Sequence, residues 1–156
     1  MYDRCRNVHN NRGDIMRHQE LLSALLKTTQ TGQVEIRSLL DTAMGSNIRN
    51  TLQSQLLEYD TMETEVLTLA LQRGCELNPL RPGVRFLTDR ITRFQVNGQT
   101  PDSRIAEIMI QKNTKAMISS LKNQHQSQCH DAQLCILSQK IIDCITAHIR
   151  QLQYYL

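Results

Sequence analysis

The sequence contains few aromatic side chains: it has no Trp, two Phe and four Tyr among 156 residues. Strands favour aromatic and β-branched residues, so this scarcity argues against an all-β fold. Hydrophobic residues still make up 40% of the chain, which is enough for a real core. Such a core must consist mainly of Leu, Ile and Met, and it suits packed helices. Three Pro and six Gly are also too few for a chain rich in tight turns.

The sequence also lacks long apolar runs and paired cysteines. No run reaches the roughly 18 residues of a membrane span, and the N-terminus has no apolar signal segment. Five cysteines are an odd number, and none forms a Cys-x-x-Cys pair, which excludes a fully paired disulfide framework. Free thiols predict a cytoplasmic location. A net charge of +3 is too small for a dedicated nucleic-acid binder.

Helical periodicity is what the sequence does contain. Apolar residues recur at spacings of three and four along four long segments, about 14–44, 46–73, 101–123 and 131–156. Asp14 is expected to cap the first of these helices, and a short extra helix is expected at 84–94 in the long crossover 75–100. We therefore predict one helical-bundle domain, residues 14–156, preceded by a flexible basic arm, residues 1–13.

The middle of the first helix is unusually small and polar. Thr29 and Gly32 stand where the apolar stripe would normally carry Leu. One interpretation is a close approach of two helices at Gly32, because glycine has no side chain. The other is a space left between helices for a ligand or a metal.

Charges divide the chain into an acidic first half and a basic connector. The run Glu58, Asp60, Glu63 and Glu65 on the second helix predicts a solvated face. The connector carries Arg81, Arg85, Arg90 and Arg93. This asymmetry could pair two subunits or two edges of one bundle. A nucleic-acid accessory role for the connector is an alternative, although Phe86 and Phe94 alone make a poor stacking platform.

Metal and catalytic motifs are sparse. Four-helix bundles with a di-metal centre use a Glu from each of two helices and a Glu-x-x-His motif from each of the other two. The chain offers Glu35, Glu58, Glu63 and Glu107 but no such motif, so no cofactor is expected, with iron or another divalent metal as the alternative.

His125–Cys129 and Cys144–His148 have the spacing of two ligands on one helical face, but each pair alone has too few ligands. Gly-x-Ser-x-Gly and phosphate-loop motifs are absent from the sequence, so we expect no enzyme.

The third helix has two faces. On a helical wheel Glu107 lies roughly 160° from Met109, the centre of its apolar arc. Ile110, Ile118 and Leu121 lie nearer to Glu107. These four residues therefore predict a second contact face on this helix rather than a metal ligand set.

The order of these parts carries a resemblance. The segment from Ser103 to Gln111 contains Ile-Ala-Glu followed by Met-Ile-Gln, and the last helix ends in Ile149 to Leu156 with two adjacent Tyr. This layout resembles the uncharacterised ferritin-like helical bundles of anaerobic gut Firmicutes. The resemblance implies a bacterial, up-down four-helix bundle with a long crossover, and it implies no activity.

The sequence therefore predicts an all-α, ferritin-like bundle. Its expected role is a non-catalytic one, through self-association into a homo-oligomer or contact with another helical protein. A metal-binding, di-iron-like bundle is the first alternative, and a nucleic-acid accessory protein is the second.

Overall fold

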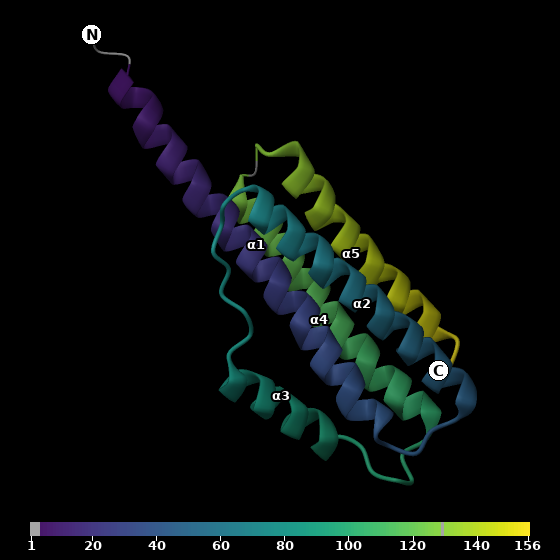
Figure 1. Ribbon diagram of the computed structural model, residues 1–156. Coiled ribbons are helices and arrows are strands. Elements are labelled where there is room, and N and C mark those ends of the chain that lie inside the picture. Colours follow the sequence, from purple (N-terminus) through teal and green to yellow (C-terminus); the bar gives the residue numbers. More distant parts are fainter. Residues whose placement is uncertain (1–3, 129) are drawn as a thin grey trace.

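The computed structural model describes residues 4–128 and 130–156, and this part of the chain forms five helices (Figure 1). They are α1 (Arg4–Leu40), α2 (Ser46–Gln72), α3 (Pro82–Phe94), α4 (Asp102–Ser127) and α5 (Ala132–Gln153). Four of them lie side by side as a bundle, in which α1 contacts α2 and α4, and α5 contacts α4 and α2. The short helix α3 packs outside the bundle against α1. The predicted all-α bundle with a helix in the crossover is confirmed.

Three helix ends show clear capping chemistry, whereas α2 and α4 begin without a hydrogen bond from a capping side chain. Gly74 follows α2 with a φ of +63°, a left-handed conformation that glycine adopts without a Cβ clash. Pro82 opens α3, where its missing N–H leaves no hydrogen bond unmade. The Asp131 carboxylate caps α5 by accepting hydrogen bonds from the backbone N–H groups of Gln133 and Leu134.

The start of the first helix differs from the prediction. The helix begins at Arg4, so Asp14 lies inside it instead of capping it. A long helix is possible here because no Pro interrupts the segment and a single internal Gly13 costs only about 1 kcal/mol. The N-terminal turns of α1 extend beyond the other helices (Figure 1). Residues 1–3 of the predicted arm lie outside the described residues.

The core is built from Leu, Ile and Met with one large aromatic ring. Tyr59 of α2 is 1% exposed and is the largest of the fully buried side chains. The predicted stripe of α1 is buried around it, including Leu22, Leu25, Ile36 and Leu39. Within the described residues, no helix combines the length and the apolarity needed to cross a membrane.

Candidate functional site

Tyr59 lies at the centre of the bundle and contacts three other helices. A Cβ atom on Gly32 of α1 would lie 2.6 Å from the Cζ atom of the Tyr59 ring. The Tyr59 hydroxyl donates a hydrogen bond to Oδ1 of Asn113 on α4 at 3.1 Å. Its ring meets the ring of His148 on α5 edge-on, with the centroids 5.0 Å apart. Gly32 is therefore small because the tyrosine ring occupies the space of a side chain.

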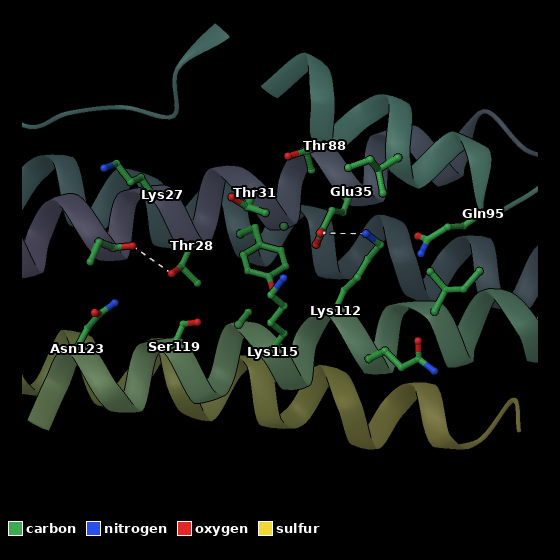
Figure 2. Close-up of a pocket in the computed structure, with 17 residues that line it drawn as sticks. Lys27, Thr28, Thr31, Glu35, Thr88, Gln95, Lys112, Lys115, Ser119 and Asn123 are labelled. Atoms are coloured by element: carbon green, nitrogen blue, oxygen red, sulfur yellow. Dashed lines mark hydrogen bonds and ion pairs between the residues drawn. The ribbon is translucent and has the colours of Figure 1, made fainter. Parts of the chain in front are cut away.

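A cavity of about 620 Å³ lies beside this ring, between α1 and α4, with α3 at one end (Figure 2). That volume is typical of sites that hold a small molecule. Helix α1 contributes Thr28, Thr31 and Glu35, and α4 contributes Lys112, Lys115, Ser119 and Asn123. Both interpretations of Gly32 thus apply, because the glycine admits the ring and also lines the cavity.

An ion pair spans this cavity. The Lys112 ammonium lies 3.2 Å from the Glu35 carboxylate, and both side chains are mostly buried. Burial raises the pKa of Glu35, while Lys112 and, more weakly, Lys115 oppose this rise. Within the described part of the chain, Lys27 and Lys115 form no ion pair, so the cavity lining carries an excess of positive charge.

A second cluster lies on the other side of the bundle, between α2 and α5. Oε2 of Glu58 lies 2.9 Å from Nε2 of His148 and 3.3 Å from Sγ of Cys144, and that sulfur is 3.4 Å from Nε2. The His148 side chain is completely buried, whereas the Glu58 side chain is 41% exposed. Burial raises the pKa of Cys144 to about 12, with Glu58 adding to the effect, and burial lowers the pKa of His148.

The sequence had already placed Cys144 and His148 on one helical face as a pair with too few ligands. The structure adds Glu58 from α2 as a third donor. Among the described residues, this is the only group of three or more His, Cys, Asp or Glu whose ligand atoms all lie within 4.8 Å of one another. No local sequence signal could have found it, because Glu58 and His148 are 90 residues apart.

The four carboxylates considered for a di-metal centre do not converge. Glu35 pairs with Lys112, and Glu63 accepts hydrogen bonds from the side chains of Gln30 and Gln33. Glu107 lies on the surface beside Arg104, at 2.6 Å. The Lys112 ammonium already supplies the positive charge that Glu35 needs, so a di-metal centre does not fit these residues.

The acidic run of α2 does not form one solvated face. Asp60 and Glu63 face α1, where both accept hydrogen bonds from Gln33. Glu58 and Glu65 face α5, where Glu65 pairs with Lys140 at 2.6 Å. Helical periodicity explains this division, because residues three apart or seven apart share a side of the helix.

Helix α3 carries Val84, Leu87, Ile91 and Phe94, whose spacing predicted it, but these side chains stay largely exposed instead of packing into the core. The contact with α1 is polar: Asp89 accepts a hydrogen bond from Ser38 at 2.6 Å, and Arg93 pairs with Asp41 at 2.7 Å. The large apolar side chains of α3 are 47–88% exposed, and Ile91 among them also lines the edge of the cavity; they are Val84, Phe86, Leu87, Ile91 and Phe94. We call these five residues the α3 apolar row.

The basic connector and the second face of α4 are both on the surface. Arg93 is engaged with Asp41 and Asp89, and the Arg90 guanidinium lies 5.5 Å from the centre of the Phe86 ring. Arg81 directly precedes this helix, and Arg85 lies in its first turn. On α4, Glu107 and Ile118 are 46% exposed, whereas Ile110 and Leu121 are half-buried. A shallow hollow beside them is lined by Ile110 and Ile118.

Comparisons with known proteins identify the class of fold. The chain matches no protein-family model and no curated protein. It is similar to the crystal structure of Dps92 from Deinococcus radiodurans, with a TM-score of 0.71, 14% identity, and coverage of 92% of this chain and 87% of that chain. This likeness shows the fold alone: the chain is a ferritin-like helical bundle. The ferritin-like part of the resemblance seen in the sequence is confirmed at that level.

Proposed function

We propose that this protein is a non-catalytic ferritin-like bundle that associates with further copies of itself through α3. The observation that supports this is the exposed α3 apolar row. Large contiguous apolar patches are rare on proteins that act alone and usually mark an interaction surface. Burying one Leu or Phe side chain is worth about 1.5–3 kcal/mol, so covering this row would stabilise an assembly substantially.

A second copy offers a matching surface on α2. The outward side of this helix carries an uncharged, exposed row at alternating spacings of four and three residues: Asn50, Ser54, Leu57, Thr61, Thr64, Thr68 and Leu71. We call it the α2 outer row. Such spacing presents one continuous stripe to a partner helix.

Charge complementarity favours this pairing over contact between two α3 helices. The partly exposed carboxylates of Asp60 and Glu65 lie on either side of the α2 outer row, each also paired within its own chain, whereas α3 carries Arg85 and Arg90. Two α3 helices facing each other would bring like charges together. The contact between α3 and the α2 outer row instead brings opposite charges together, which favours its formation.

Sedimentation velocity at several protein concentrations tests the proposal. We expect the native chain to form dimers or larger species, and Phe94→Asp and Leu57→Asp each to shift the chain toward the monomer. Ile136→Asp on α5 is the matched control, since Ile136 is as exposed as Leu57 (68% and 67%) but lies away from both rows. A native chain that stays monomeric at the highest concentration overturns the proposal. Dissociation by Phe94→Asp alone would remove α2 as the partner surface.

The cavity between α1 and α4 favours a second candidate function, the binding of a small anion with an apolar body. The ammonium groups of Lys27 and Lys115, which form no ion pair within the described residues, would attract the anion, while Ile91, Ile108 and the Tyr59 ring offer apolar contact. Fluorescence titration with 8-anilinonaphthalene-1-sulfonate tests it. We expect Lys27→Met/Lys115→Met to weaken binding by at least about tenfold, because the loss of even one charged hydrogen bond costs about 1.5–3 kcal/mol. Lys122→Met, an exposed lysine of α4 outside the cavity lining, should leave binding unchanged; an equal loss in both variants would contradict the candidate.

A further inference from the structure

We propose that Glu58, Cys144 and His148 bind a single divalent cation of the zinc class, between α2 and α5. This site is separate from the di-metal arrangement that the fold suggests, because Glu35, Glu63 and Glu107 take no part in it. It is also independent of self-association, since all three donors come from one chain.

The spacing of the donor atoms fits one ion. A tetrahedral zinc holds N and O at about 2.0–2.1 Å and S at about 2.3 Å, which sets its ligand atoms roughly 3.3–3.6 Å apart. The two distances from the Cys144 sulfur, 3.3 Å to Glu58 and 3.4 Å to His148, lie at that spacing. The hydrogen bond of 2.9 Å between Glu58 and His148 must open by only about 0.5 Å to admit the ion.

Two of the donors are held in place by the fold. Cys144 and His148 are four residues apart on α5 and therefore share one face of a rigid helix. The His148 ring is completely buried and lies against the edge of the Tyr59 ring, so it has little freedom to turn away. Preorganised ligands of this kind lower the entropy that binding must overcome.

Glu58 supplies both flexibility and access. Its side chain is 41% exposed, so it can adjust by the small shift that the ion requires, and it opens the cluster to solvent. An ion can enter from this side. A water molecule can complete a four-coordinate shell there, as in open zinc sites with three protein ligands.

The donor set selects the class of metal. Magnesium and calcium prefer sites made only of oxygen donors, whereas a thiolate with an imidazole suits zinc and similar borderline ions. On binding, the Cys144 thiol releases its proton to solvent, and the thiolate and the Glu58 carboxylate together balance the two positive charges of the ion.

Within the described residues, Nδ1 of His148 has no hydrogen-bond partner. This ligand therefore lacks the second hydrogen bond that orients the histidine and raises affinity in many zinc sites. We therefore expect binding weaker than in structural zinc sites.

Titration of the full chain with Co²⁺, followed by Zn²⁺ competition, tests the site. Tetrahedral Co²⁺ bound to a thiolate gives a sulfur-to-metal charge-transfer band, which reports the Cys144 contact directly. We expect one Co²⁺ per chain, this band, displacement by Zn²⁺ and a rise in Tm with Zn²⁺. Chain that binds no Co²⁺, or binds it without the band, overturns the proposal.

Two variants test the Cys144 and Glu58 ligands, and a third variant is the control. Cys144→Ser should abolish the band and weaken binding by roughly 100-fold, since losing a ligand costs at least as much as losing a hydrogen bond that orients that ligand. Glu58→Gln, which keeps an acceptor oxygen for His148, should weaken binding while leaving the fold intact. Cys75→Ser is the thiol control, because Cys75 is a free cysteine that lies outside this cluster. Circular dichroism confirms that each variant is folded, and a band that survives in Cys144→Ser but disappears in Cys75→Ser would refute the assignment.

Discussion

The ring of Tyr59 occupies the space that the missing side chain of Gly32 leaves on α1. A Cβ atom there would lie 2.6 Å from the ring, which real structures do not tolerate, and the buried ring has little room to move aside. This contact brings α1 and α2 close together at the centre of the bundle. It also sets the ring between the cavity on one side and His148 on the other.

The first prediction follows from this contact. Gly32→Ala should lower the free energy of unfolding by about 1–3 kcal/mol, because overpacking outweighs the gain in helix propensity. Gly13→Ala is the matched control on the same helix: no atom of the described part of the chain lies within 4 Å of its Cβ position, so it should stabilise the chain by about 0.5–1 kcal/mol. Urea denaturation measures both values. A Gly32→Ala chain as stable as Gly13→Ala would show that the ring can move aside.

The hydrogen bond from Tyr59 to Asn113 gives a second prediction. Tyr59→Phe leaves Oδ1 of Asn113 buried without its donor, and Nδ2 of the same side chain already has no hydrogen-bond partner among the described residues. We expect a loss of about 1–3 kcal/mol in the free energy of unfolding. Tyr59→Phe/Asn113→Leu should be less damaging than Tyr59→Phe alone, because it removes both polar partners together. A double variant whose loss equals the sum of the two single losses would exclude this coupling.

Local patterns were sufficient to predict the bundle. The breaker at Gly74 and the polar start near Asp131 act within a few residues, and the structure places helix ends at both, whereas Pro82 opens α3 two residues before the expected start at Val84. The N-terminus of α1 was missed because Asp14 has the chemistry of a cap but lies in a segment without a breaker. A cap favours a helix start without forbidding the helix to continue.

The candidate sites could be predicted only in part: Gly32 and the Cys144–His148 pair stood out in the sequence, but their partners depend on how each helix is rotated against its neighbours. Glu58 belongs to an acidic run that resembles a solvated face, yet α2 turns it toward His148. The apolar spacing of α3 predicted a helix correctly, but the contact with α1 is made through Asp89 and Arg93 instead. Rotations of this kind are decided by packing across tens of residues, and hydrophobic periodicity does not encode them.

The ion pair between Glu35 and Lys112 gives a third prediction. Lys112→Met leaves a mostly buried carboxylate without its partner and should cost up to about 3 kcal/mol, the lower end of the range for buried pairs. Glu35→Leu/Lys112→Met removes both charges and should recover that loss or exceed the native stability. A double variant that is less stable than the native chain would show that the pair contributes more than its desolvation costs.

The pH dependence of the Lys112→Met variant has a definite sign. Burial raises the pKa of Glu35 in the folded chain above its value in the unfolded chain. The protonated carboxyl therefore contributes its full stabilisation below the unfolded pKa. This stabilisation is lost as pH rises through the folded pKa. Removing Lys112 takes away the group that opposes this rise. The deficit of Lys112→Met should therefore be large at neutral pH and shrink in acid, as measured by urea denaturation over a pH series. The Glu35→Leu/Lys112→Met chain, which lacks the carboxyl, should not show this dependence.

The cap of α5 gives the last prediction, and its sign is opposite. Asp131 accepts two backbone hydrogen bonds and pairs with Arg73 at 2.7 Å, and the hydrogen bond from Arg73 is the main cause that lowers the pKa of Asp131. Its stabilisation is therefore present above the unfolded pKa and is lost as pH falls through the folded value. Asp131→Ala should lower the free energy of unfolding by about 1 kcal/mol at neutral pH through loss of the cap. Asp131→Asn keeps a capping oxygen without the charge, so its free energy of unfolding should lie between those of Asp131→Ala and the native chain. Its difference from the native chain should disappear in strong acid. A deficit of Asp131→Asn that persists unchanged below the usual Asp titration range would show that the amide disturbs the cap itself rather than only removing the charge.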